Sequence, residues 1–165
     1  MKYMFASDVH GSAYYCRKML DVYKEEKAER LVLLGDLLYH GPRNDLPREY
    51  APKQVISMLN DMKKEIYAVR GNCEAEVDQM VLQFPVMADY CILNLDGRTF
   101  YATHGHIYNE NNLPPIQEGD ILIHGHTHVL KAEQKEGYVL LRLHMRSLRT
   151  VCLQLRILRE ILLRA

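Results

Sequence analysis

The chain has 165 residues, a length suited to one domain with a sizeable hydrophobic core. Apolar residues make up 48% and charged residues 25%, an ordinary globular composition that excludes an intrinsically disordered chain. The formal net charge is zero, so the overall charge predicts neither a nucleic-acid partner nor a membrane surface.

Short apolar runs that end in glycine-containing turns predict several β-strands. These runs are residues 2–7, 30–34, 65–69, 99–103 and 120–124. Helical patterns lie between the early strands, at 12–26 behind a Ser12 cap and at 52–64 with Pro52 near the start. Strands that alternate with helices predict an α/β domain whose first half pairs its strands in parallel.

The second half is predicted to contain more strand than helix. Helical patterns thin out from residue 85, and Asp96-Gly97 between two apolar runs predicts a hairpin turn. We therefore expect a second sheet that packs on the first.

The last segment, residues 142–165, differs from the rest in charge. It carries six arginines and one acid, a local balance of +5, which leaves −5 for residues 1–141. Its apolar spacing fits a helix, while residues 151–157 also fit a strand, and periodicity leaves both open. We expect residues 1–141 to form the domain and 142–165 to form a basic tail packed on it.

The cysteines and the N-terminal segment indicate a compartment. Cys16, Cys73, Cys91 and Cys152 show no C-x-x-C spacing, which favours reduced thiols over a disulfide framework. The first residues contain no apolar run of signal-peptide length, and no run reaches the length of a membrane span. These features predict a cytoplasmic protein without a membrane partner.

Potential metal ligands occupy the turn after each of the five apolar runs that are predicted to form strands. The turns are Asp8-Val9-His10-Gly11, Gly35-Asp36, Gly71-Asn72, His104-Gly105-His106 and Gly125-His126-Thr127-His128. Each pattern alone is an ordinary turn. The carboxyl ends of strands in an open α/β sheet share one rim, so the ordered set predicts that these side chains converge.

The types of ligand atom in these turns indicate which metal ions would bind. Residues i and i+2 of a strand face the same side, so Asp8 with His10, and His126 with His128, are expected to grip cations as pairs. Asp36 has two carboxylate oxygens and can bridge two ions. Mixed imidazole, carboxylate and amide donors suit manganese, iron or zinc better than calcium or magnesium. Two such ions, ~3.5–4 Å apart, support in-line phosphoryl displacement by lowering the pKa of a bridging water.

The ordered set D-x-H, G-D, G-N, G-H and G-H-x-H resembles the calcineurin-like metallophosphoesterase superfamily. The likeness is strongest to its compact bacterial branch, the YfcE-type phosphodiesterases, and covers residues 1–140 with the segments HGPRN (40–44) and RGNCEAEVDQM (70–80). It implies an α/β fold, a four-layer αββα sandwich of two mixed sheets. It also implies two divalent ions, manganese before iron or zinc. One ion is held by Asp8, His10 and His128, the other by Asn72, His104 and His126, and Asp36 bridges them.

Further residues receive roles from the same resemblance. Cys73 stands where larger members carry the histidine proposed as general acid, and a thiol with a reference pKa near ~8.5 can donate a proton. His106 is expected either to face the phosphate or to support the ligands. Arg43 and Asn44 are candidates for contacting an anionic substrate, with a solvated surface position as the alternative, and His124 is expected to be structural.

The sequence thus predicts a metal-dependent phosphodiesterase that acts on a small phosphoester through a metal-bridging hydroxide. The preference for diesters comes from the resemblance only. Two alternatives stay open: a phosphomonoesterase with the same centre, and a non-catalytic protein-interaction scaffold of the same fold, in which ligand histidines are lost. A homo-oligomer also stays open. Relatives usually continue after residue 140 with an Asn-Pro-Gly-Ser turn and a closing strand, so the ending of this chain is atypical.

Overall fold

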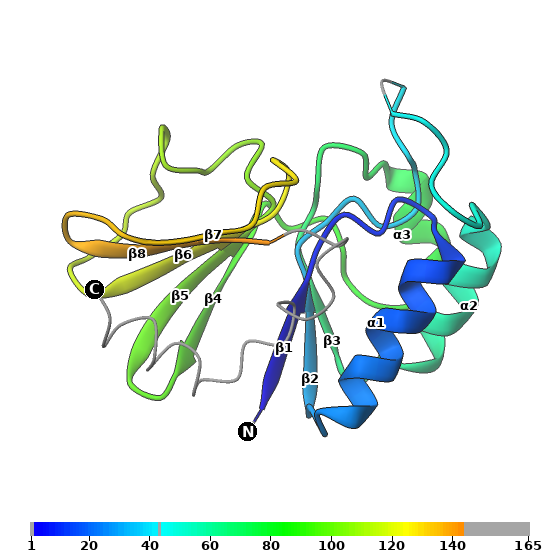
Figure 1. The fold of residues 1–165 in the computed structure, drawn as a ribbon, viewed down its shortest axis with the longest axis horizontal. Helices are drawn as coiled ribbons and strands as arrows, with labels where there is room; N and C mark the ends of the chain where they lie inside the picture. The colour runs from blue at the N-terminus through cyan, green and yellow to red at the C-terminus, as the bar shows by residue number, and fades with distance from the viewer. Residues whose placement is uncertain (1, 43, 144–165) are drawn as a thin grey trace.

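Two β-sheets face each other in the computed structural model, which describes residues 2–42 and 44–143 (Figure 1). The elements are β1 (Tyr3–Ala6), α1 (Ala13–Glu25), β2 (Arg30–Leu33), α2 (Pro52–Asp61), β3 (Ile66–Ala68), α3 (Glu76–Val81), β4 (Tyr90–Leu95), β5 (Arg98–Thr103), β6 (Asp120–His124), β7 (Lys131–Gln134) and β8 (Tyr138–Arg142). Arg43 and residues 144–165 of the predicted tail lie outside the described residues.

The first sheet has the order β1-β2-β3 with parallel pairing, as predicted for the first half. Helices α1 and α2 cover its outer face (Figure 1). Ser12 caps α1 by accepting a hydrogen bond from the Tyr15 N–H at 3.2 Å, and Pro52 occupies the start of α2, where no N–H is needed. The predicted helix at 52–64 ends at Asp61, because residues 62–65 turn into β3.

Both faces of β1 and β2 are buried. Met4 packs toward the helices, whereas Phe5 packs toward the second sheet, where its ring stacks on Phe100 with centroids 6.1 Å apart. Burial on both faces explains why β1 and β2 are continuous apolar runs rather than alternating ones. The layers therefore follow the order helix, sheet, sheet, with one apolar core between the helices and the first sheet and a second between the two sheets.

The second sheet has the order β4-β5-β6-β8-β7 and mixed pairing. The predicted hairpin is confirmed: Asp96 and Gly97 join β4 to β5 with φ of 48° and 77°, the left-handed pair of a tight hairpin turn. The outer face of this sheet packs against Ile116, and Tyr101 donates a hydrogen bond to the Pro115 carbonyl at 2.9 Å. In the part of the chain described, that face carries a loop and no helix.

Three elements were not expected from the sequence, namely α3, β7 and β8. Helix α3 buries none of its residues, so it leaves no apolar periodicity to detect. Strand β8, which no predicted strand covered, lies between β6 and β7 and continues past the predicted boundary at residue 141. The division at 141 otherwise stays a prediction.

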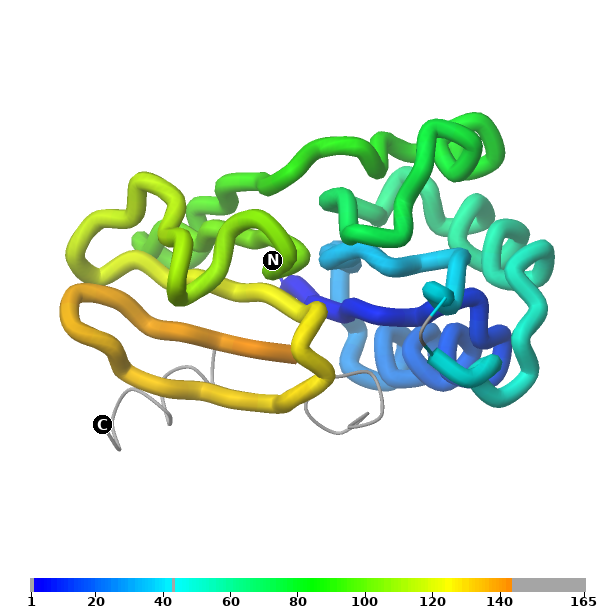
Figure 2. The backbone as a smooth tube through the Cα atoms, turned by 90° about the horizontal axis from the view of Figure 1, so that it is seen from above, coloured from blue at the N-terminus to red at the C-terminus, as the bar shows by residue number. Residues whose placement is uncertain are grey.

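The two halves of the chain lie side by side (Figure 2). The segment after α3 crosses from the first sheet to the second, so the turns that follow β1, β2 and β3 face those that follow β5 and β6. Among the described residues, no helix is both long and apolar enough to cross a bilayer.

Candidate metal centre

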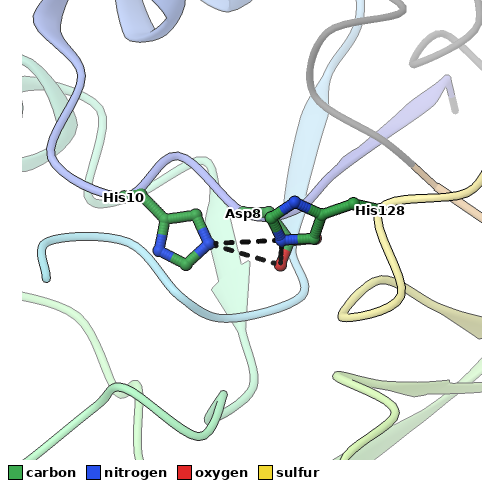
Figure 3. A group of neighbouring side chains, drawn as sticks. All are labelled: Asp8, His10 and His128. Carbon is green, nitrogen blue, oxygen red and sulfur yellow. Dashed lines mark hydrogen bonds and ion pairs between the residues drawn. The ribbon is translucent and has the colours of Figure 1, made fainter. Parts of the chain in front are cut away.

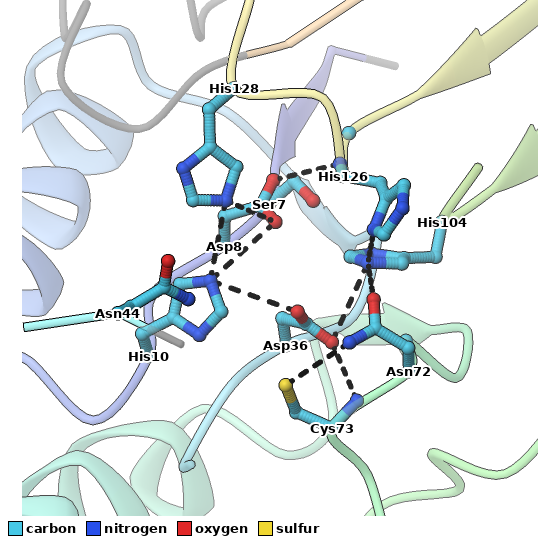
Figure 4. Close-up of polar contacts among 12 residues, drawn as sticks. Ser7, Asp8, His10, Asp36, Asn44, Asn72, Cys73, His104, His126 and His128 are labelled. Carbon is cyan, nitrogen blue, oxygen red and sulfur yellow. Dashed lines mark hydrogen bonds and ion pairs between the residues drawn. The ribbon is translucent and has the colours of Figure 1, made fainter. Parts of the chain in front are cut away.

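Side chains from the five predicted turns meet between the two sheets (Figure 4). Asp36, which follows β2, lies in the middle: its Oδ2 is 3.7 Å from His10 Nε2, and its Oδ1 is 3.5 Å from His104 Nε2. One carboxylate therefore faces two imidazoles that come from different sheets. This is the geometry that a bridging ligand requires.

The first group consists of Asp8, His10 and His128 (Figure 3). His128 Nε2 lies 3.3 Å from Asp8 Oδ1 and 3.4 Å from His10 Nε2, and His10 Nε2 lies 3.8 Å from Asp8 Oδ1. Two ligand atoms that are each ~2.0–2.2 Å from one ion are at most about 4.4 Å apart. The three side chains therefore fit around one cation.

The second group consists of Asn72, His104 and His126. His104 Nε2 lies 3.0 Å from Asn72 Oδ1 and 3.2 Å from His126 Nδ1. These distances also fit one cation. With Asp36 between the two groups, the structure brings all seven predicted ligand residues together.

The proton positions show why a cation fits here. Nδ1 of His10 donates to the Tyr39 carbonyl at 2.8 Å, and Nδ1 of His104 donates to the Leu34 carbonyl at 2.7 Å, since a carbonyl only accepts. In the neutral rings, both Nε2 lone pairs then point into the centre. There the Nε2 of His104 meets Asn72 Oδ1, another acceptor. Within the described residues, Asp8 Oδ1 is also buried without a hydrogen-bond partner. Hydrogen-bond acceptors that point at one another have no donor between them, and a metal ion bound there would stabilise this arrangement.

The expected strand geometry of the D-x-H and H-x-H pairs is wrong. Strand β1 ends at Ala6 and β6 at His124, and the ligands follow in left-handed backbone. The φ values are 62° at Asp8, 49° at His10, 56° at Asp36, 64° at His126 and 53° at His128. As a result Asp8 and His10 do converge, but His126 and His128 point to different groups. Left-handed φ costs a residue other than glycine of order 1–3 kcal/mol and is concentrated at functional sites.

Two positions in these turns require glycine because neighbouring atoms leave no room for a Cβ. A Cβ at Gly125 would clash with Ser7 Oγ and Asp8 Oδ2, and a Cβ at Gly71 would clash with the carboxylate of Asp36. The left-handed conformation in this turn belongs to His126 and not to Gly125. The glycine instead lets the turn after β6 approach the turn after β1.

Glu74 is a buried residue that the sequence reading missed. Its carboxylate accepts hydrogen bonds from the backbone N–H groups of Asp36 at 2.8 Å, Leu37 at 2.7 Å and Gly71 at 2.5 Å. Burial raises the pKa of Glu74 above its ordinary value, against the lowering effect of these N–H groups. The carboxylate ties the turn after β2 to the turn after β3. The signal for Glu74 in the sequence was an acidic residue two positions after Asn72.

Cys73 and Asn44 line the open side of the centre. A cavity of about 200 Å³ is bordered by His10, Asp36, Gly41, Pro42, Asn44, Asn72, Cys73, His126 and His128. Burial and the neighbouring Asp36 carboxylate raise the pKa of Cys73 to about 12, so its thiol is protonated at neutral pH. Asn44 donates a hydrogen bond to the His40 carbonyl at 2.9 Å. Arg43, the other expected substrate contact, lies outside the described residues.

His106 and His124 lie behind the ligands. The His106 ring centroid is 5.3 Å from that of His104, and the ring does not border the cavity. Burial and the neighbouring His104 lower the pKa of His106 to about 4, so its imidazole is neutral at neutral pH. His124 is fully buried, packs on Gly105 and has Nε2 3.2 Å from Glu110 Oε2. These are structural contacts, as expected for His124.

Burial and neighbouring charge also act on the ligands. Burial acts to raise the pKa of Asp8, but the imidazoles of His128 and His104 outweigh it and hold this pKa below its ordinary value. Burial and the neighbouring His104 lower the pKa of His126. A carboxylate that stays ionised and an imidazole that stays neutral are the protonation states that bind a cation.

Comparison with known proteins gives a consistent relationship. Residues 1–143 match the calcineurin-like phosphoesterase superfamily domain. Phosphodiesterase YfcE of Escherichia coli strain K12 is 47% identical over 135 residues, which cover 82% of this chain and 73% of YfcE. A phosphodiesterase of Methanocaldococcus jannaschii is 24% identical over 136 residues, which cover 78% of this chain and 74% of that protein.

Solved structures agree with the sequence relationship. The structure of E. coli YfcE, a phosphoesterase, matches with a TM-score of 0.84 at 44% identity, covering 86% of this chain and 78% of that one. Vacuolar protein sorting 29 of Cryptosporidium parvum matches with a TM-score of 0.55 at 17% identity, covering 85% of this chain and 72% of that one, which is a likeness of fold alone. The resemblance to the compact bacterial branch is confirmed, and so is the predicted α/β fold with two sheets. Within the described residues three of the four expected layers are present, and the first sheet is parallel rather than mixed.

Proposed function

The chain belongs to the calcineurin-like phosphoesterase superfamily and is a metal-dependent phosphoester hydrolase, and we propose that its substrate is a small phosphodiester. We further propose that the seven residues around Asp36 hold two divalent metal ions, with manganese preferred to iron or zinc. When bound, two such ions supply a bridging hydroxide for attack on phosphorus and neutralise developing charge.

The position of Asp36 carries this proposal. Its two oxygens face His10 and His104, whose Nδ1 atoms are both held by backbone carbonyls. The inward lone pairs are therefore fixed before any ion binds. A single metal would leave one of the two groups of acceptors without a partner, so the arrangement favours two.

The cavity residues would then act on the substrate. A volume of about 200 Å³ is below the ~300–1,000 Å³ of drug-sized sites, which favours a small phosphoester head group. We assign Asn44 to the substrate side. The Cys73 thiol borders the space where the leaving group departs and can give it a proton, although its high pKa makes it a weak acid.

Other residues take supporting parts in this proposal. Neutral His106 would hold His104 rather than deliver a proton, and Arg43 stays a predicted anion contact. The free thiols of Cys16, Cys73 and Cys91 support a reducing, cytoplasmic location. All seven ligand positions are filled, which favours catalysis over the scaffold alternative.

The decisive experiment compares an aryl phosphodiester with the matching aryl phosphomonoester, each with Mn²⁺ and with a chelator. We expect diester turnover that exceeds monoester turnover, needs Mn²⁺ at two ions per chain, and falls about 10²- to 10³-fold in Asp36→Asn. Faster monoester turnover would make the enzyme a phosphomonoesterase. A folded sample that holds two ions and hydrolyses neither ester would favour the scaffold.

A further inference from the structure

The thiol of Cys73 lies against one end of the metal centre. We propose that Cys73, His10 and Asp36 form an alternative site for a single thiophilic cation such as Zn²⁺ or Cd²⁺, and that filling it stops hydrolysis. The site itself stands on geometry, and the inhibition rests on the proposed function.

The three ligand atoms are close enough for one ion. Sγ of Cys73, a ring nitrogen of His10 and a carboxylate oxygen of Asp36 all lie within 4.8 Å of one another, and His10 Nε2 is 3.7 Å from Asp36 Oδ2. Zinc takes sulfur at ~2.3 Å and nitrogen or oxygen at ~2.0–2.2 Å, so the ligand atoms of a tetrahedral zinc site lie ~3.4–3.6 Å apart. The His10–Asp36 distance already matches this spacing, and rotation of the Cys73 side chain would bring its thiol to the same spacing.

The side chains are held in place independently of any ion. The Cys73 N–H donates to Asp36 Oδ1 at 2.9 Å, and the Asn72 amide donates to Cys73 Sγ at 3.3 Å (Figure 4). His10 Nδ1 is held by the Tyr39 carbonyl, so Nε2 faces the ion. All three proposed ligands border the cavity, which leaves a fourth position open to water. One sulfur, one nitrogen and one oxygen are a zinc-type donor set.

The softness of the cation would decide which site is used. Manganese prefers oxygen and imidazole donors and leaves the thiol protonated, whereas zinc and cadmium favour sulfur. On binding, the S–H bond breaks, the proton passes to solvent and a sulfur–metal bond forms, with no electron transferred. His10 and Asp36 are then withdrawn from the hydrolytic centre, and Cys73 has no proton to give.

Cadmium provides a direct probe, because a cadmium–thiolate bond absorbs in the ultraviolet. Cd²⁺ is titrated into the Mn²⁺-loaded protein while absorption and residual aryl diester hydrolysis are followed. The wild-type protein should bind one Cd²⁺ per chain with a thiolate band, and Cys73→Ser should lose the band. A control that replaces Cys16, Cys91 and Cys152 with serine should keep it.

Inhibition supplies the second measurement. With each protein normalised to its own Mn²⁺ activity, half-inhibition should need at least about tenfold more Cd²⁺ in Cys73→Ser and Cys73→Ala than in wild type, about 1.4 kcal/mol of binding. A band that persists in both variants, or equal half-inhibition, overturns the proposal. If Mn²⁺ supports no hydrolysis, the proposed function fails, and the absorption titration still decides the site.

Discussion

At the scale of single residues, the metal centre depends on strained backbone conformations that hydrogen bonds between turns hold in place. Asp8, His10 and Asp36 all have left-handed φ. The Asp8 N–H donates to the Gly35 carbonyl at 3.1 Å, and the His10 N–H donates to the Asp36 carbonyl at 2.8 Å. The turns after β1 and β2 thereby fix each other. Such bonds offset the conformational cost and hold the donors in place before a cation binds.

Glu74 extends this support to the turn after β3, and Glu74→Gln tests it. Glutamine keeps the shape but turns an NH₂ group toward backbone N–H donors, which leaves a buried donor without a partner. We expect Mn²⁺ affinity to fall about 10- to 100-fold, with part of the activity regained at saturating Mn²⁺. Mn²⁺ affinity is measured by competition with a chelator. Glu76→Gln, at an exposed acid nearby, is the control, and equal affinity in both variants would refute the support role.

Cys73 provides a second test at this scale. Histidine at position 73 would place a group with an ordinary pKa near ~6.5 where the thiol has a pKa of about 12. A better acid helps a poor leaving group most. We therefore expect Cys73→His to raise turnover of an unactivated alkyl diester more than that of an aryl diester. Steady-state rates on both esters check this, and equal or opposite changes would argue against proton donation at this position.

At the scale of elements, β8 supports the strand that delivers two of the proposed ligands. It pairs in parallel with β6 from Asp120↔Tyr138 to His124↔Arg142. The Leu143 N–H donates to the His124 carbonyl at 2.8 Å, and Arg142 Nη1 lies 3.2 Å from Glu110 Oε1. The end of β8 therefore fixes the position from which the chain enters the turn with His126 and His128.

Two truncations separate β8 from the tail. Ending the chain after Leu141 removes Arg142 and the buried Leu143, whose side chain contributes about 1.5–3 kcal/mol through burial. We expect this protein to melt below one that ends after Leu143. We also expect the protein that ends after Leu143 to melt below the full chain or to aggregate, since the tail is predicted to cover apolar surface. Thermal unfolding checks both steps, and three identical melting curves would rule out both contributions.

At the scale of the whole molecule, each sheet supplies part of the centre. Turns of the first sheet carry Asp8, His10, Asp36 and Asn72, and turns of the second carry His104, His126 and His128. The inner faces of the sheets share one apolar core that includes Phe5 and Phe100. Metal binding should therefore stabilise the packing of the two sheets, because the ions bind only when both halves are in place.

The pH dependence of stability follows from the histidines. The pKa of His106 is lowered to about 4, and burial also lowers the pKa of His124 and of His126. Unfolded histidines take up protons near pH ~6.5, so the unfolded state binds more protons below that pH. In chelator, stability should be greatest above pH ~6.5 and fall progressively toward pH 4.

Melting temperatures at pH 7.5, 6.5 and 5.5, with chelator and with Mn²⁺, measure this directly. The gain from Mn²⁺ should shrink as the pH falls, since protons compete for the imidazole nitrogens. His106→Asn should flatten the slope in chelator. A melting temperature that rises as the pH falls would contradict the inference.

The local pattern of the chain was sufficient for much of the fold and for the identity of the candidate ligands. Apolar runs fixed the strands at Tyr3–Ala6 and Asp120–His124, Ser12 and Pro52 marked helix starts, and Asp96-Gly97 specified the hairpin, because each depends on neighbours in sequence. The ordered turns indicated which side chains would converge.

Only the tertiary structure decided how the candidate ligand side chains converge. The left-handed φ of His126 and His128, which sends them to different groups, depends on Gly125 approaching Ser7 and Asp8 across the sheets. Glu74 acquires its role from N–H groups of another turn, and β8 is identified by its place between β6 and β7. These features arise from contacts between residues far apart in the chain, which local sequence patterns do not specify.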